Sequence, residues 1–166
     1  MDNRPIGVFD SGLGGLTVVK ALKELLPNES IVYFGDTARL PYGVKSQGLV
    51  KQYSKEIIKF LLEKNAKAVI IACNTATAMA LNSLKNEFKD IPIIGVIDPG
   101  SEKAIFETTT KKIGVIGTIA TISSGAYEKS IQQKNNKVKI ISKACPLFVP
   151  FVEEGLINGP AINEIA

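Results

Sequence analysis

The 166-residue sequence contains no histidine, only two cysteines and only two arginines. Without histidine a zinc site is disfavoured, and two cysteines in a chain of this size do not make a disulfide framework. Arg4 and Arg39 leave little for direct readout of nucleic acid bases. The net charge of +4 comes from lysines spaced singly, a pattern typical of solvated helix faces. We therefore expect no metal and no nucleic acid partner.

Long apolar runs are also missing. Runs such as residues 68–72 are far shorter than the ~20 residues that a membrane-spanning helix needs. Residues 1–4 do not begin a secretion signal. Hydrophobic residues make up 45% of the chain and charged residues 22%, which is typical of a folded globular protein. We expect a cytoplasmic protein that makes no use of a membrane.

Short, β-branched apolar runs alternate along the chain with segments of helical periodicity. This alternation predicts an α/β fold, doubly wound around a mainly parallel sheet. The expected buried strands are 6–9, 31–34, 68–72, 93–97, 113–116 and 138–141. The sequence Asp-Pro-Gly at 98–100 predicts a turn, and we place a crossover between two lobes there.

An internal repeat supports two lobes. Residues 113–118 resemble residues 6–11 at an offset of 107 positions, and both runs are strands that lead into a small hydroxyl residue. We therefore expect two pseudo-symmetric lobes, 1–97 and 98–166. The same offset puts a twin of Cys73 at about position 180, past the end of this sequence, so the second lobe is expected to be incomplete.

The residues that directly follow the expected strands are small and polar. Open α/β sheets bind ligands at this carboxyl edge. The residues concerned are Asp10-Ser11, Asp36-Thr37, Cys73-Asn74-Thr75 and Thr118. We therefore expect the functional site to be built from them.

The glycine-rich segment 10–15 precedes a predicted helix, so its backbone N–H groups can face a carboxylate or phosphate. It is not a P-loop, because it lacks Gly-Lys-Ser/Thr. Thr17 stands where a dinucleotide fingerprint has its third glycine. The alternative interpretation is a tight turn with a helix cap.

Cys73 follows the run 68–72 and precedes the helical segment 75–88. A position near a helix N-terminus favours the thiolate, and Asp10 can take up or guide the proton. The alternative is a buried structural cysteine. Cys145 is interpreted as structural, because the repeat aligns it with a position near residue 38 instead of Cys73.

The remaining candidates have both a functional and a structural interpretation. Asn74 and Thr75 suit the orientation of a carboxylate or ammonium group, but both are common helix caps. In 41–43, Tyr42 can form a pocket wall and Gly43 can present its N–H, or the segment can be only a turn. Capping also explains the hydroxyls of 118–124, from which we select Thr118 alone, and Glu153 can be part of a solvated helix.

Four ordered motifs resemble those of bacterial glutamate racemases. They are GVFDSGLGG (7–15), GD (35–36) with PYG (41–43), ACNTA (72–76) and GVIDPG (95–100). The similarity continues through 116–118, 126–127 and 144–147 to 153–155, so it covers nearly the whole chain. The family is cofactor-independent: a thiolate on one face of glutamate removes the Cα proton, and a thiol on the other face returns one.

The resemblance implies roles for the candidate residues. It makes Cys73 one of the two thiols and Asp10 its assistant. Substrate contacts carried over are Asp10, Ser11, Tyr42, Gly43, Asn74, Thr75 and Thr118, with Pro41 and Glu153 as possible additions. It also implies supply of D-glutamate for peptidoglycan, hence for the cell wall and cell shape, by a cytoplasmic homodimer.

The sequence departs from the family at the second thiol. The family's second cysteine sits in a Gly-Cys-Thr-His motif, and this sequence has no histidine. We expect a truncated racemase that lacks its second base and racemises glutamate poorly or not at all. Two alternatives stay open: a lyase of the same fold that uses one thiol, and a non-catalytic module that binds a small carboxylate.

Overall fold

The computed structural model describes residues 2–165, in which four parallel strands form the first sheet. The strands are β1 (Ile6–Asp10), β2 (Ile31–Gly35), β3 (Ala68–Ile71) and β4 (Ile93–Gly95), in the order β2-β1-β3-β4. The helices that accompany them are α1 (Leu16–Leu25), the short 3₁₀ helix η1 (Tyr42–Val44), α2 (Gln47–Glu63) and α3 (Asn74–Glu87). The central strand β1 is buried along its whole length.

Helices cover both faces of this sheet. Val8 of β1 points to the face where Val18 and Leu22 of α1 pack. Phe9 points to the opposite face and packs in the main core with residues of α2 and α3. β1 is therefore buried on both faces, and the predicted doubly wound α/β fold with a mainly parallel sheet is confirmed.

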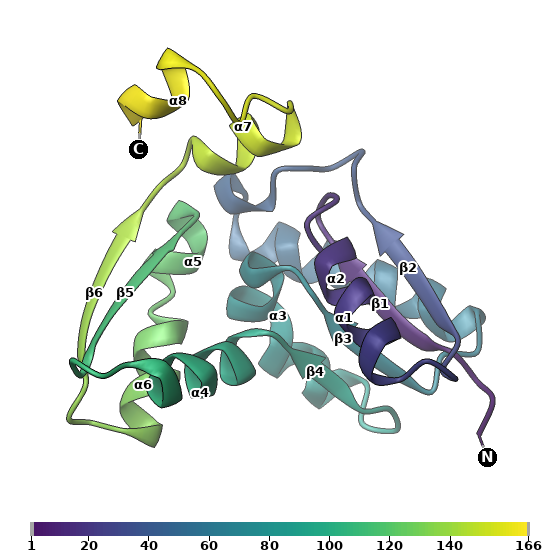
Figure 1. The fold of residues 1–166 in the computed structure, drawn as a ribbon. Helices are drawn as coiled ribbons and strands as arrows, with labels where there is room; N and C mark the ends of the chain where they lie inside the picture. The colour runs from purple at the N-terminus through teal and green to yellow at the C-terminus, as the bar shows by residue number, and fades with distance from the viewer. Residues whose placement is uncertain (1, 166) are drawn as a thin grey trace.

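The second sheet is a parallel pair, β5 (Lys112–Gly117) and β6 (Lys139–Ala144). The elements around it are α4 (Ile97–Glu107), α5 (Ile119–Ser123), α6 (Ala126–Lys134), α7 (Phe148–Glu153) and α8 (Pro160–Ile165). Figure 1 shows the two sheets on opposite sides of the molecule, with α3 and α4 between them and α7 and α8 above. Ile113 and Val115 pack against α4 and α6, whereas Ile116 and Ile141 on the other face are exposed.

Three expectations are corrected. The fourth strand ends at Gly95, and residues 98–100 lie in the first helical turn of α4 instead of forming a turn. Pro99 fits there because the first N–H groups of a helix have no intrahelical partner to lose. β5 alternates between buried and exposed residues and β6 between half-buried and exposed residues, so neither strand is buried on both faces.

The lobe division at residues 97 and 98 stays a prediction, although the first sheet uses only strands before it and the second only strands after it. Within residues 2–165, no helix is long and apolar enough to cross a membrane.

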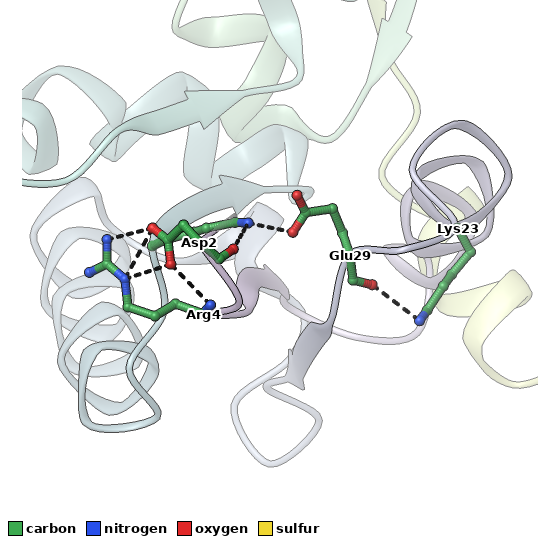
Figure 2. A network of polar contacts seen from close by, with 5 residues as sticks. Asp2, Arg4, Lys23 and Glu29 are labelled. Atoms are coloured by element: carbon green, nitrogen blue, oxygen red, sulfur yellow. Dashed lines mark hydrogen bonds and ion pairs between the residues drawn. The ribbon is translucent and has the colours of Figure 1, made fainter.

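A network of hydrogen bonds and ion pairs connects the segments that precede β1, β2 and β3 (Figure 2). Arg4 pairs with Asp2, and the Lys67 ammonium donates to both the Asp2 carbonyl and the Glu29 carboxylate. Lys23 donates to the Glu29 carbonyl. These groups precede β1, β2 and β3, so they lie at the edge of the sheet opposite to the predicted site and have a structural role.

Candidate active site

A cavity of about 490 Å³ lies where the carboxyl ends of β1, β3 and β5 meet. Ten of the twelve residues that the sequence selects line it: Asp10, Ser11, Pro41, Tyr42, Gly43, Cys73, Asn74, Thr75, Thr118 and Glu153. The expectation for Asp36 and Thr37 is corrected, because these two residues follow β2 and do not line the cavity. Cys145 is not among the lining residues. The structure therefore brings the candidates together, and their chemical roles stay predictions.

The Cys73 thiol lies at the N-terminus of α3. It is the N-cap residue, and its Sγ accepts a hydrogen bond from the Ala76 N–H at 3.3 Å. The thiol also donates to Ser11 Oγ at 3.5 Å. Only 4% of Cys73 is exposed, and that part faces the cavity.

The expectation that the helix N-terminus favours the Cys73 thiolate is wrong, because the pKa of this thiol is raised. Burial raises the pKa of Cys73 from 9.0 to about 11, and the negative charge of Asp10 adds to the rise. Hydrogen bonding with Ser11 and with the Ala76 N–H lowers the pKa of Cys73, but by less than burial raises it. The neutral thiol is therefore the resting form at neutral pH, because desolvation destabilises the thiolate more than the N-terminus of α3 stabilises it.

This raised pKa predicts how the thiol reacts with iodoacetamide. In a Cys145→Ala chain, Cys73 is the one remaining thiol. Only the thiolate reacts, so its alkylation rate should rise about tenfold per pH unit from pH 7 to 10 without levelling, since the pKa of Cys73 is about 11. The rate is measured by mass spectrometry. A plateau near pH 8 would contradict the raised pKa.

The glycine-rich segment holds a carboxylate of the chain itself. Asp10 Oδ2 accepts hydrogen bonds from the N–H groups of Gly12 at 3.3 Å and Gly15 at 3.0 Å. A Cβ on Gly15 would lie 2.6 Å from the Asp10 Cβ, so only glycine fits. The expectation that these two N–H groups face a ligand is corrected, because they orient Asp10 at the cavity wall.

Glu153 reaches the same segment from α7. Its Oε1 accepts a hydrogen bond from the Leu13 N–H at 3.5 Å. Glu153 is half-buried and lines the cavity. A carboxylate from the second half of the chain therefore lies at the pocket beside the loop that follows Asp10, and not on a fully solvated helix face.

Three threonine hydroxyls form a triangle beneath the cavity. Thr75 Oγ1 lies 3.0 Å from Thr118 Oγ1 and 3.2 Å from Thr121 Oγ1, and the latter two are 3.0 Å apart. Thr118 also caps α5 by accepting from the Thr121 N–H. Thr121 was not selected from the sequence; it is 3% exposed and does not line the cavity.

Tyr127 is the main cavity residue that the sequence argument missed. Its hydroxyl donates to Asn74 Oδ1 at 2.6 Å, and burial raises the pKa of this phenol, which keeps it protonated. With its Oδ1 engaged, Asn74 has its NH₂ group left to donate to a ligand. Phe148, Val149 and Val152 of α7 add an apolar wall.

The charged residues that line the cavity are both acidic. They are Asp10 and Glu153, and within residues 2–165 no lysine or arginine lines it. A ligand carboxylate must therefore be bound by hydroxyl, amide and backbone N–H groups, whereas an ammonium group finds carboxylates. This combination suits an amino acid zwitterion better than a phosphate.

Comparison with known proteins supports the same interpretation. The family model described as Asp/Glu/Hydantoin racemase matches residues 6–149. The glutamate racemase of Aquifex aeolicus (strain VF5) is 53% identical over 154 residues, which are 93% of this chain and 59% of the relative. That of Chlorobaculum tepidum is 50% identical over 162 residues, 98% of this chain and 60% of the relative.

Solved structures agree with the sequence comparison. The glutamate racemase from Francisella tularensis subsp. tularensis SCHU S4, in complex with D-glutamate, superposes with a TM-score of 0.91 at 46% identity, over 99% of this chain and 62% of that one. The Aquifex pyrophilus glutamate racemase has a TM-score of 0.84 at 46% identity, over 97% of this chain and 63% of that one. The present chain thus spans about three fifths of the length of these relatives. The family match covers most of the chain and the predicted resemblance is confirmed, so this chain belongs to the Asp/Glu/hydantoin racemase family.

Proposed function

We propose that this chain carries a glutamate-binding site of a cofactor-independent glutamate racemase, an isomerase that converts L-glutamate to D-glutamate, and that Cys73 exchanges the Cα proton. The supporting observation is the Cys73 thiol in a cavity that offers carboxylates to an ammonium group and neutral donors to a carboxylate. Relatives about half identical to this chain are glutamate racemases.

The proposed step moves one proton at a time. Cys73 gives its proton to Asp10, whose charge already acts on the thiol. The thiolate then removes the Cα proton, so a C–H bond breaks, an S–H bond forms and the electron pair delocalises into the adjacent carboxylate. The raised pKa of Cys73 means that the thiolate is unfavourable without substrate, and the ammonium group of bound glutamate offsets this by stabilising a nearby anion.

One thiol serves one face of the substrate. Cys73 is the cysteine that lines the cavity within residues 2–165. Inversion needs an acid positioned on the opposite face, because protonation in the right geometry depends on a prearranged donor. This chain by itself should therefore exchange the Cα proton and return it to the same face.

The test is incubation of the purified chain with L-glutamate, and separately with D-glutamate, in D₂O. Deuterium at Cα is followed by NMR and handedness by chiral chromatography. We expect deuterium to enter with retention. Appreciable inversion would contradict the single-thiol step, and binding of glutamate without exchange would leave only a carboxylate-binding module. 2-Methylglutamate, which has no Cα proton, is the control for binding without chemistry.

The wider role is proposed on the same basis. A glutamate racemase supplies D-glutamate for peptidoglycan, and so for the cell wall and cell shape, from the cytoplasm, and we propose a homodimer. Sedimentation of the purified chain tests the homodimer directly.

A further inference from the structure

Asp36 is a buried carboxylate beside the cavity that the proposed chemistry does not use. It follows β2, is 4% exposed and does not line the cavity. Its oxygens accept hydrogen bonds from Arg39 Nε at 3.0 and 2.7 Å, and Oδ2 also accepts from the Tyr42 hydroxyl. Its backbone N–H donates to the Asp10 carbonyl at 2.9 Å.

Arg39 holds this carboxylate in place and compensates its charge. The guanidinium also pairs with Glu56 and lies over the Tyr53 ring, 4.3 Å from its centroid. The Tyr53 ring in turn packs 5.8 Å from that of Tyr42. A buried carboxylate is costly unless it is paired and hydrogen-bonded, so the cluster fixes Asp36 as a charged acceptor.

Tyr42 connects the cluster to the cavity. Its side chain is 1% exposed and lines the cavity together with Pro41 and Gly43. Gly43 lies so close to Thr118 that an added Cβ would be 2.4 Å from the Thr118 Cβ. The Tyr42 hydroxyl thus ties one wall of the cavity to Asp36, and that wall contacts the threonine triangle.

We infer that Asp36 is a positioning residue, which through the Tyr42 hydroxyl holds the wall of residues 41–43 in the geometry that binds substrate. The identity of the substrate rests on the proposed function. Asparagine at 36 keeps the shape but lacks the charge that attracts Arg39. Its one neutral oxygen is a weaker acceptor for the Tyr42 hydroxyl than a carboxylate is.

The test compares Asp36→Asn with Tyr42→Phe and with their double variant. We expect each single variant to raise the KM of glutamate for Cα exchange at least tenfold while kcat falls less than about threefold. The double variant should be no worse than Tyr42→Phe, because that variant already removes the hydrogen bond through which Asp36 acts. Glu102→Gln, which removes an exposed ion pair with Lys134, is the matched control and should change neither value.

A second readout does not depend on substrate. In the Cys145→Ala background, iodoacetamide should alkylate Cys73 at least fivefold faster in Asp36→Asn and by a similar factor in Tyr42→Phe, because the wall beside the thiol is released. Acceleration by Asp36→Asn but not by Tyr42→Phe would indicate an effect of charge and would overturn the positioning role. Unchanged alkylation rates in both variants, or KM increases that add in the double variant, would overturn it as well.

If the unmodified chain neither binds nor exchanges glutamate, the proposed function fails, and the alkylation rates still decide the role of Asp36. Thermal unfolding of each variant shows whether it is folded. If Asp36→Asn does not fold, the alkylation rate and KM of Tyr42→Phe decide the proposal, because that variant keeps the ring and its packing.

Discussion

Replacement of Cys73 by serine should lower deuterium exchange at the Cα of glutamate on the order of 10³-fold or more, because it removes the thiol proposed as the general base. The hydroxyl is a far weaker acid than the thiol, so it supplies almost no anion at neutral pH. Serine is nevertheless a good N-cap and can keep the acceptor for the Ala76 N–H. Exchange is measured by loss of the Cα proton signal in D₂O, and thermal unfolding should be nearly unchanged.

Two further variants separate the chemistry from the fold. Cys73→Ala removes both the thiol and the N-cap, so it should lose exchange and about 1 kcal/mol of unfolding free energy. Cys145→Ala removes the other thiol, which does not line the cavity, and exchange should be unchanged. Retained exchange in Cys73→Ser together with its loss in Cys145→Ala would assign the base to Cys145.

The first three strands were predictable because helices cover both faces of their sheet, so each strand is a continuous apolar run. Continuous apolar runs located β1, β2 and β3 to within one residue at each end. The fourth strand was drawn two residues too long, because Val96 and Ile97 are as apolar as the strand that they follow. Hydrophobic periodicity cannot distinguish the end of a buried strand from the first turn of a buried helix. Proline is compatible with either a turn or a helix start.

The site was predictable to the extent that it is built from strand ends. Cys73 and Asp10 could be selected because each lies at the carboxyl end of a strand, at the same edge of one sheet. Tyr127 was missed because it lies on α6 and reaches Asn74 only through the packing of helices that are distant in sequence. The direction of the Cys73 pKa was missed for a related reason, since depth of burial is a property of tertiary structure.

Replacement of Gly43 by alanine should destabilise the chain by about 1–3 kcal/mol and weaken glutamate binding at least tenfold. The new Cβ would lie 2.4 Å from the Thr118 Cβ and 2.5 Å from its Cγ2, so η1 and α5 must move apart at the cavity wall. The φ of Gly43 is not positive, so the backbone accepts alanine and the effect is one of space alone. Urea unfolding and calorimetric titration with glutamate measure the two changes.

The variants at Thr118 make this prediction specific. In a Thr118→Gly background the three clashing atoms are gone, so Gly43→Ala should cost less than about 0.5 kcal/mol there, whereas Thr118→Ser keeps the Cβ and should rescue little. Gly48→Ala is the matched control, since nothing lies within 4 Å of its added Cβ in the first turn of α2. It should be neutral or stabilise by up to about 1 kcal/mol. An equal loss from Gly43→Ala with and without the Thr118 side chain would show that the contact between η1 and α5 does not shape the cavity.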